Sequence, residues 1–417
     1  MIQVRKSIPL SRLALLEAEN LVIRKDGDAL IAYFDFENPI LLNRHQLSES
    51  FDRLQEGLRE NQLSFHGLIG FFGYEFLAAN FDLRLTAKTD LDLPDGWFAR
   101  PNSLVRMNPG CTLFESSIPE REVEIKSILT EKKGNPLEGS SSRSSSVQNL
   151  DCNLAFGEYE KIFEKAREAI LDGETYQIKI SQRFESKAAI NPLLAFEKLC
   201  VTNPAPEAFL LQTPSFSIVS CSPEVVIEKK GSRIVTRPIG GTYQRNQDGN
   251  DGSVIEQFLR DPKEVAEHNM LVDLERNDLS TICKPGSVRI ERFQEVESYS
   301  HLHHLVSTIS GELRSNIRLR EILSAMLPGG SITGCPKPRT MEWIDQLEPC
   351  FRGPYTGSFG TIESNGDIRL NLIIRSMIAT NSRCFVQAGG GIVIDSTPEY
   401  EYNENRIKAQ ALLDLLV

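Results

Sequence analysis

The sequence predicts an α+β fold, and three observations support this prediction. Strand-like runs follow one another in hairpin-like succession, as in FSIVSCSPEVVIEK and SRIVTRPI. Helical patterns separate groups of such runs instead of following every strand, which argues against strict βαβ alternation. The composition, with 40% hydrophobic and 25% charged residues, is typical of globular proteins. A chain of 417 residues is long enough for two domains or one large domain with a well-covered core.

Residues 1–131 are expected to form an N-terminal sheet-forming region. The runs LVIRKDG and ALIAYFDF are strand-like, and the segment HGLIGFFGYEF follows them. Residues 132–150 contain six serines together with Gly, Pro and Asn, a composition that cannot bury much apolar surface. We therefore expect a Ser-rich linker or loop at this place.

Residues 151–417 carry the strongest secondary-structure signals and are expected to form the catalytic region. GEYEKIFEKAREAILDG predicts a helix that stops at Gly173, and YQIKISQRF alternates like a half-buried strand. DPKEVAEHNMLVDLERNDL predicts a helix with Asp261 as the cap, Pro262 in the first position and Glu264 placed for a capping box. RLNLIIRSMIAT and RCFVQAGGGIVI predict core strands, and TPEYEYNENRIKAQALLDLL predicts a closing helix.

Charge and hydropathy exclude several classes of protein. A net charge of −11 argues against binding nucleic acid, which requires a basic face. No run approaches the ~20 apolar residues of a membrane helix, and the first twenty residues lack the apolar core of a secretory signal. The eight cysteines are scattered without CxxC pairs, which favours reduced thiols, a cytoplasmic protein and no cysteine-bound zinc.

Two predicted helices carry the pattern Glu-x-x-Glu, at Glu264 with Glu267 and at Glu401 with Glu404. Residues three apart share a helix face, so each helix can present two carboxylates in one direction. Two such faces brought together would give an all-oxygen site for a hard cation such as Mg²⁺. The structural alternative stays open at this point, because Glu264 can cap its helix and Glu404 can pair with Lys408.

Other candidate residues lie in the second half of the chain. GGSITGCPKPRT fails the P-loop pattern, since no Ser or Thr follows its lysine, but its glycines and hydroxyl groups could still face a carboxylate. SYSHLHHLVS places His301 and His303 on one strand face and His304 on the other, which favours one working histidine over a zinc cluster. Arg375 stands in an apolar strand pattern, where an arginine needs an anion.

Taken together, these stretches resemble the chorismate-utilising enzymes, a family that includes anthranilate synthases, aminodeoxychorismate synthases, and isochorismate and salicylate synthases. The matching stretches, in family order from about residue 157 to 410, are YQIKISQRF, SCSPEVV, RPIGGT, EHNMLVDLERNDL, YSHLHHLVS, GGSITGCPKPRTMEWIDQLEP, RGPYTGSFG, LIIRSM and QAGGGIVIDSTPEYEYNE. The resemblance implies a large two-sheet sandwich with flanking helices, and a pocket for chorismate.

The resemblance also implies a role for particular residues. Glu224 matches the acid that protonates the departing C4 hydroxyl group, and Glu267 and Glu404 match Mg²⁺-binding glutamates, with Glu264 and Glu401 beside them. Thr242 and His304 match pocket residues with catalytic roles. The residues that match the substrate pocket are Gly241, Thr242, Ser331, Tyr355, Arg375, Gly389, Gly390, Gly391 and Lys408.

The resemblance favours the amine-forming branch, because Gln177 stands where water-using members carry an activating lysine. Within that branch, GGSITG and AGGGIVIDSTPE resemble aminodeoxychorismate synthase component I, whereas Gly240 stands where many of those enzymes have a nucleophilic lysine and anthranilate synthases have alanine. The expected activity is Mg²⁺-dependent amination of chorismate to 4-amino-4-deoxychorismate, with anthranilate formation as the alternative and an inactive chorismate-binding subunit as a third.

Lys179 is a candidate substitute for the missing lysine, because it shares a strand face with Gln177 and Ser181. A solvent-facing lysine is the simpler interpretation from sequence, and direct attack by ammonia is another alternative. We find no glutamine-hydrolysing triad, since Cys335 before a proline lacks the expected context. Ammonia is therefore expected from a separate glutaminase subunit or from solution.

Overall fold

The computed structural model describes residues 2–4, 8–60, 62–130, 150–245, 251–298 and 302–416, without the side chains of Ile2, Val4, Thr242, Gln244 and Leu302. The predicted Ser-rich segment, apart from Leu150, and His301 lie outside the described residues. Within the described part, none of the helices is long and apolar enough to cross a membrane.

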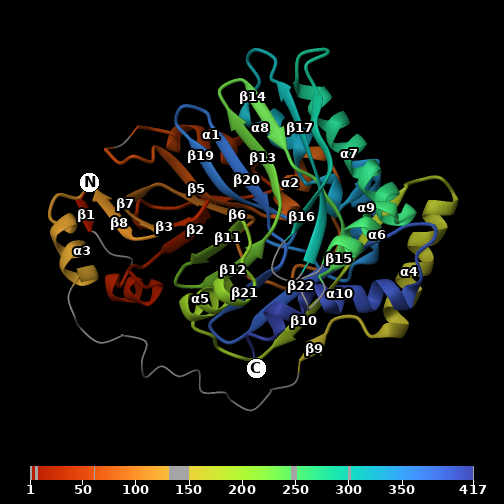
Figure 1. Cartoon of the computed structure of the whole chain (residues 1–417), viewed down its shortest axis with the longest axis horizontal. Helices are drawn as coiled ribbons and strands as arrows, with labels where there is room; N and C mark the ends of the chain where they lie inside the picture. The colour runs from red at the N-terminus through yellow and green to blue at the C-terminus, as the bar shows by residue number, and fades with distance from the viewer. Residues whose placement is uncertain are drawn as a thin grey trace.

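Two large antiparallel sheets form the centre of the protein (Figure 1). Among the described residues, the first sheet has twelve strands. In spatial order they are β1 (Ile2–Val4), β8 (Cys111–Ser116), β7 (Pro101–Asn108), β3 (Ala29–Phe36), β2 (Leu21–Asp26), β11 (Glu207–Gln212), β12 (Phe216–Ser222), β21 (Ser376–Thr380), β22 (Cys384–Ile392), β10 (Gln177–Ser186) and β18 (Gly334–Cys335), with β9 (Asp151–Cys152) beside β10.

The second sheet has ten strands in the same described part of the chain. In spatial order they are β15 (Ile239–Gln244), β17 (Leu302–Glu312), β14 (Arg233–Thr236), β13 (Val225–Lys230), β20 (Ile368–Leu372), β19 (Ser358–Glu363), β5 (Gly67–Phe72), β6 (Gly96–Ala99) and β4 (Ile40–Leu42), with β16 (Arg289–Ser298) beside β17. Strands from the first 130 residues extend both sheets, since β2 pairs with β11 and β5 pairs with β19.

Helices flank the two sheets (Figure 1). The α-helices are α1 (Leu47–Gly57), α2 (Tyr74–Ala78), α3 (Arg121–Thr130), α4 (Phe156–Leu171), α5 (Pro192–Thr202), α6 (Gly252–Arg260), α7 (Pro262–Ile282), α8 (Leu319–Met326), α9 (Lys337–Leu347) and α10 (Pro398–Leu413), and the 3-10 helices are η1 (Leu10–Leu16), η2 (Ala79–Phe81) and η3 (Gly330–Ile332). Apolar side chains of α3, α5 and α10 pack on the first sheet, and those of α1, α7 and α8 pack on the second.

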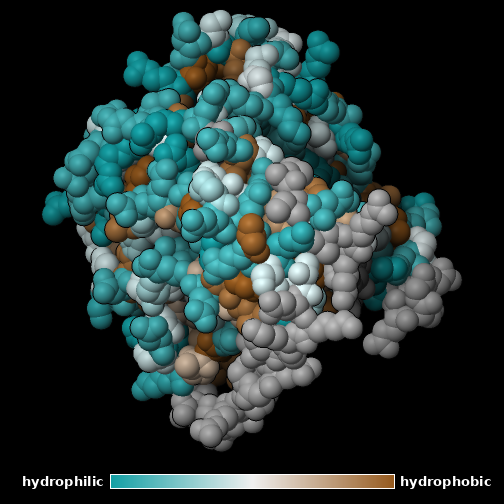
Figure 2. All heavy atoms as spheres, turned by 90° about the vertical axis from the view of Figure 1, so that its left-hand side faces the viewer, coloured by the Kyte–Doolittle hydropathy of each residue, from teal (hydrophilic) through white to brown (hydrophobic). Residues whose placement is uncertain are grey.

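The facing sides of the two sheets share a core of aromatic and branched side chains. Phe209 of β11 in the first sheet stacks on Phe359 of β19 in the second, with ring centroids 3.7 Å apart. Apolar burial against both sheets and the flanking helices is the main favourable contribution to such a fold. The predicted α+β sandwich with flanking helices is therefore confirmed. On the face shown in Figure 2, hydrophobic side chains form separate spots among hydrophilic ones.

Three local signals of the predicted helices, at Gly173, Asp261 and Pro262, are confirmed. Helix α4 ends just before Gly173, which has a φ of +75°. In α7, the side chain of Asp261 accepts hydrogen bonds from the N–H groups of Lys263 and Glu264 at 3.0 and 3.3 Å, and Pro262 is the first helical residue. These bonds satisfy N–H groups that the first helical turn leaves without partners.

Two strand predictions need correction. Strand β10 is not half-buried, because it lies inside the first sheet and both of its faces are largely covered. The run RLNLIIRSMIAT is not one strand but two, since β20 belongs to the second sheet and β21 to the first. Arg375 lies in the break between them with a φ of +50°. An apolar run alone does not reveal where a chain leaves one sheet for the other.

Candidate active site

The chain passes from one sheet to the other in two neighbouring segments, and each segment contains a predicted site residue. The chain passes from β12 to β13 at Glu224, and from β20 to β21 at Arg375. The crossings are hydrogen-bonded to each other, from the N–H of Cys221 to the carbonyl of Arg375 at 3.0 Å and from the N–H of Leu372 to the carbonyl of Glu224 at 3.1 Å. The paired backbones therefore fix both residues where the sheets separate.

A cavity of about 150 Å³ opens beside these crossings. Helix α7 packs on β15 and helix α10 packs on β22 (Figure 1). Residues of both helices contribute to the walls of the cavity. The cavity brings together most of the residues singled out in the sequence: Lys179, Glu224, Gly241, Glu264, Glu267, His304, Ser331, Tyr355, Arg375, Gly389, Gly391, Glu401, Glu404 and Lys408. Thr242 pairs with His304 across β15 and β17, but its side chain is outside the described part.

Glu224 is a buried carboxyl group in the cavity wall. Only 4% of the residue is exposed, and Oε1 accepts a hydrogen bond of 2.9 Å from the hydroxyl group of Ser331. Burial raises the pKa of Glu224 to about 7, although Ser331 and Lys179 act to lower it. A carboxyl group with this pKa is partly protonated at neutral pH and can donate a proton to a leaving group.

Arg375 supplies a positive charge to the cavity wall from its left-handed backbone conformation. A non-glycine residue with positive φ is uncommon and often marks a functional position. Among the described residues, no carboxylate forms an ion pair with its guanidinium group. The group is therefore available to bind an anion such as a substrate carboxylate.

The four predicted acidic residues of α7 and α10 reach the same cavity. Burial raises the pKa of Glu401, and the neighbouring Glu404 raises it further, while the hydroxyl group of Ser396 donates to Glu401 at 2.8 Å. Burial opposes ionisation of Glu404, but the ammonium group of Lys408, 2.9 Å away, and those of Lys179 and Lys263 bring its pKa below the ordinary value. The Glu404–Lys408 pair considered from sequence thus exists inside the cavity.

Lys263 is a functional candidate that sequence reasoning missed. It lies in the cavity wall, one residue before Glu264, and its Nζ is 4.5 Å from the ring centroid of Tyr400. Burial acts to lower the pKa of Lys263, but Tyr400, Glu401, Glu264 and Glu267 together raise this pKa above its ordinary value. A lysine in the first turn of an acidic helix was the available signal, but such a residue usually faces solvent.

Lys179 lies in the cavity wall. This position differs from the solvent-facing one that the sequence favoured. Burial lowers the pKa of Lys179, and the ammonium group of Lys408 lowers it further. Lys179 pairs with Gly391 across β10 and β22, so no side chain of the partner residue covers it. A larger population of neutral amine makes this lysine a better nucleophile than a solvated one.

Each of the two glycines of RPIGGT is required for a different structural reason. A Cβ on Gly240 would lie 2.7 Å from Nδ1 and 2.9 Å from the backbone Cα of His268 in α7. Gly241 has a φ of +68° in a bulge of β15, and a Cβ there would lie 2.8 Å from Oε2 of Glu264. The first glycine therefore admits the helix, and the second permits the bulge beside an acidic residue of the cavity.

The three glycines of AGGGIVI face two different sides of strand β22. Gly389 and Gly391 line the cavity, and Lys408 Nζ donates to the carbonyl of Gly389 at 3.4 Å. Gly390 is not part of that wall; a Cβ on it would lie 2.5 Å from Oε2 of Glu401 and 3.0 Å from Oε2 of Glu404. Gly390 thus leaves room for the carboxylates of α10 instead of facing the cavity.

The two described histidines of SYSHLHHLVS lie in different environments. His304 is in the cavity wall, where burial and Arg375 lower its pKa to about 4, and its Nδ1 lies 3.3 Å from the carbonyl oxygen of Gly241. Since a carbonyl group can only accept, Nδ1 carries the proton and Nε2 is an acceptor. His303 is fully buried against Ser298 and Asp251 and lies outside the cavity wall.

The arrangement fits a magnesium ion shared with substrate better than a fully protein-bound metal. Among the described residues, no three His, Cys, Asp or Glu side chains form a metal-binding group. Mg²⁺ needs only one or two carboxylates where substrate oxygens and waters complete its shell. Glu267 and Glu404, which line one cavity from two helices, have the required oxygen donors.

Comparison with known proteins identifies a family and similar proteins. A family described as chorismate binding enzyme matches residues 16–414. Aminodeoxychorismate synthase component 1 of Bacillus subtilis is 34% identical over 368 residues, covering 83% of this chain and 76% of that protein. Anthranilate synthase component 1 of Mycolicibacterium smegmatis is 36% identical over 373 residues, covering 84% and 71%.

A solved structure extends the similarity to the overall architecture. Anthranilate synthase component I from Streptococcus pneumoniae superposes with a TM-score of 0.76 at 29% identity, covering 95% of this chain and 90% of the other. The fold and the charged cavity thus define an enzyme that acts on chorismate. The chain belongs to the chorismate-binding enzyme family.

Proposed function

We propose that this chain is an aminodeoxychorismate synthase component I, which converts chorismate and ammonia to 4-amino-4-deoxychorismate for p-aminobenzoate and folate synthesis. The observation that carries the proposal is the amine of Lys179, which lies in the same cavity as the protonatable Glu224 and has a lowered pKa. The relative from Bacillus subtilis and the GGSITG loop support the same branch.

In this proposal some cavity residues bind a carboxylate of chorismate, and others react with its ring. Arg375 and the backbone around Gly389–Gly391 hold one carboxylate of chorismate, while Tyr355 and Lys408 complete the wall. Lys179 attacks C2 as both ring double bonds shift toward C4, and Glu224 protonates the hydroxyl group that leaves C4 as water. Ammonia then attacks C4, both double bonds shift back, the C2–N bond breaks, and Lys179 leaves as the neutral amine. His304 contributes an acceptor nitrogen to the cavity. The backbone of Thr242 lies beside His304 on the neighbouring strand.

Mg²⁺ is proposed as the cofactor, held by Glu267 and Glu404 with Glu264 and Glu401 beside them. When bound, it supplies positive charge that neutralises a carboxylate of chorismate. The protein also contributes positive charge of its own. Lys263 and Lys408 lie among the glutamates of α7 and α10 and reduce the repulsion between these two acidic helix faces.

A glutaminase subunit is proposed as the partner that supplies ammonia. The relatives from Bacillus subtilis and Mycolicibacterium smegmatis are named as component 1 of their synthases, which supports a second component. Free ammonium salt would serve as the nitrogen source when the partner is absent.

Anthranilate formation is the second candidate, and one contact favours it. Since His268 occupies the space beside Gly240, no nucleophilic lysine can extend from that position without displacing α7. Ammonia would then attack C2 directly, and Lys179 would only balance charge in the cavity. The anthranilate synthase relatives support this alternative as well.

The product formed from chorismate tests the proposal. The purified chain is incubated with chorismate, Mg²⁺ and an ammonium salt, with and without an aminodeoxychorismate lyase. Formation of p-aminobenzoate only after the lyase is added supports aminodeoxychorismate synthesis. Anthranilate fluorescence without the lyase supports the second candidate, and absence of turnover with either supports an inactive chorismate-binding subunit.

A further inference from the structure

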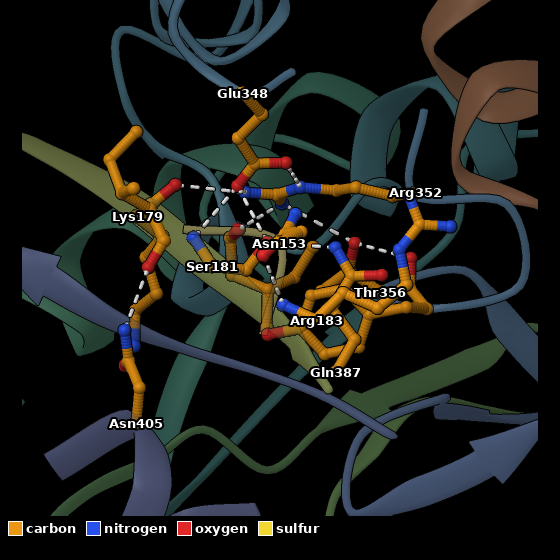
Figure 3. A network of polar contacts seen from close by, with 12 residues as sticks. Asn153, Lys179, Ser181, Arg183, Glu348, Arg352, Thr356, Gln387 and Asn405 are labelled. Carbon is orange, nitrogen blue, oxygen red and sulfur yellow. Dashed lines mark hydrogen bonds and ion pairs between the residues drawn. The ribbon is translucent and has the colours of Figure 1, made fainter. Parts of the chain in front are cut away.

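We propose that Arg352 is a positioning residue, which holds three walls of the cavity in register through its paired carboxylate Glu348. The inference rests on the proposed function, because it concerns the geometry of the proposed acid and nucleophile. Arg352 itself does not line the cavity: it is 1% exposed and lies behind the wall. Figure 3 shows its guanidinium group facing Glu348 between Lys179 and Thr356.

All five N–H positions of the guanidinium group have an acceptor. Nε and Nη2 donate to the two oxygens of Glu348 at 2.8 and 2.7 Å. Nη2 also donates to the carbonyl of Lys179 at 2.8 Å, and Nη1 donates to the carbonyl of Ile332 at 3.1 Å and to the hydroxyl group of Thr356 at 3.3 Å. A lysine could supply only three donors and could not match this planar arrangement.

The acceptors belong to three separate segments of the cavity wall. Lys179 lies in β10, Ile332 ends η3 directly after Ser331, and Thr356 follows Tyr355. The ring of Tyr355 also packs near the guanidinium group, with its centroid 5.8 Å from Cζ. One side chain therefore fixes the backbone beside the proposed nucleophile, the partner of the proposed acid and a substrate-binding ring.

Glu348 extends the same network along β10 (Figure 3). Its Oε1 accepts from the backbone N–H of Ser181 at 2.8 Å and from the Ser181 hydroxyl group at 2.7 Å. Gln387 of β22 donates to that hydroxyl group at 2.8 Å. The carboxylate thus joins the strand that carries Lys179 to the end of α9.

The loop that carries Arg352 is itself fixed from the other sheet. Glu75 of α2, which follows β5, accepts hydrogen bonds from the backbone N–H groups of Arg352 and Gly353 at 2.7 and 2.9 Å. A buried ion pair often adds little net stability compared with apolar side chains of similar volume, because both charges lose their hydration. The contribution proposed for Arg352 and Glu348 is therefore geometric rather than mainly stabilising.

The path from Arg352 to Glu224 gives a readout that a purely structural role would not change. The Ile332 carbonyl tether places Ser331, whose hydroxyl group donates to Glu224. Losing that hydrogen bond to the ionised carboxylate would raise the apparent pKa of Glu224 by about one unit. The charged groups that also act on Glu224 are Lys179 of β10 and Glu275 of α7, and neither residue is substituted in the variants below.

The test compares the pH dependence of chorismate turnover in Arg352→Lys, Ser331→Ala and the double variant. We expect the falling limb of the profile to move to higher pH by about one unit in each single variant, and no further in the double variant. The turnover number of Arg352→Lys should fall about 100-fold because the reacting groups are displaced. Arg183→Lys is the matched control, since Arg183 is a buried arginine of β10 paired with Asp90 at 3.1 Å, outside the cavity wall.

An unmoved limb in Arg352→Lys, or shifts that add in the double variant, would overturn the proposal. Should Arg352→Lys not fold, Glu348→Gln replaces it, with the same expected shift and the same overturning result. If the wild-type protein consumes no chorismate, the proposed function fails with this inference. If the wild type is active and the limb stays in place, only the positioning role fails.

Discussion

The hydroxyl group of Ser331 donates a hydrogen bond of 2.9 Å to the buried carboxyl group of Glu224. Ser331 lies in η3, and Glu224 lies where the chain crosses from one sheet to the other. The bond links η3 to the crossing and holds a carboxyl group of raised pKa in the cavity wall. Because burial is the main cause of this raised pKa, the acid depends on water being excluded around it.

Activity should fall as the pH rises through about 7, the value to which burial raises the pKa of Glu224. The protonated form donates the proton, so the acid contribution is present below this pKa and lost above it. The measurement is kcat/KM for chorismate between pH 5.5 and 9. Glu224→Gln should lower kcat by about 10² to 10⁴ and remove this limb. A rate that still rises above pH 8 would contradict the assignment.

Replacing Lys179 with methionine should abolish amination of chorismate while leaving binding of chorismate in place. The reason is that methionine fills similar volume but has no amine to attack C2. The measurement is product formation beside a calorimetric binding titration. The control is Lys187→Met, because Lys187 is exposed just beyond the same strand. Unchanged turnover in Lys179→Met would show that ammonia reacts without help from this residue.

Replacing Arg375 with methionine should weaken chorismate binding by roughly 10- to 100-fold, the loss expected for hydrogen bonds to a charged group. Calorimetric titration of chorismate in the absence of ammonia measures the change. Arg383→Met, at an exposed arginine in the following turn, should leave the affinity unchanged. Equal affinities of wild type and Arg375→Met would exclude Arg375 as the carboxylate-binding residue.

Glu267→Gln and Glu404→Gln should each weaken Mg²⁺ binding by at least tenfold, because an amide is a poorer ligand for a hard cation than a carboxylate. The measurement is a calorimetric Mg²⁺ titration with chorismate present, which does not depend on turnover. Glu399→Gln is the matched control on the first turn of α10. If Glu399→Gln, at an exposed position, weakens Mg²⁺ binding as much as the other two variants do, the metal assignment fails.

Gly240→Ala should lower the free energy of unfolding by about 1–3 kcal/mol, because the added Cβ meets His268 and its backbone. Gly157→Ala in α4 is a control with the opposite expected sign, since nothing lies within 4 Å of a Cβ there. Alanine in a helix stabilises by roughly 0.5–1 kcal/mol relative to glycine. Chemical denaturation measures the free energy of unfolding of both variants. A Gly240→Ala protein as stable as the wild type would contradict the close contact with His268.

The sequence predicted the elements whose signals are local. Asp261 and Pro262 marked the start of α7, and Gly173 marked the end of α4, because capping and left-handed turns depend on neighbouring residues. The crossing at Arg375 was not predicted, since the apolar residues on both sides continue one pattern while pairing with different sheets. Strand pairing is a long-range property that a single run does not reveal.

The candidate site was predicted in part for a similar reason. The acidic faces of α7 and α10 follow from helical spacing, and the resemblance brought them together in one pocket. The sequence favoured a solvent-facing Lys179 over its place in the cavity wall, because alternation in β10 cannot say which face meets the cavity when both are covered. Arg352 was missed, since its spacing from Glu348 is that of an ordinary i, i+4 surface pair.

The central claim is that chorismate reacts in this cavity with Lys179 as the attacking amine. The most direct measurement is mass spectrometry of the protein after incubation with chorismate and Mg²⁺ but no ammonia. The account predicts an adduct of chorismate less one water on the peptide that contains Lys179, which disappears when ammonium is added. Unmodified Lys179 in a preparation that still forms product on adding ammonium would contradict it.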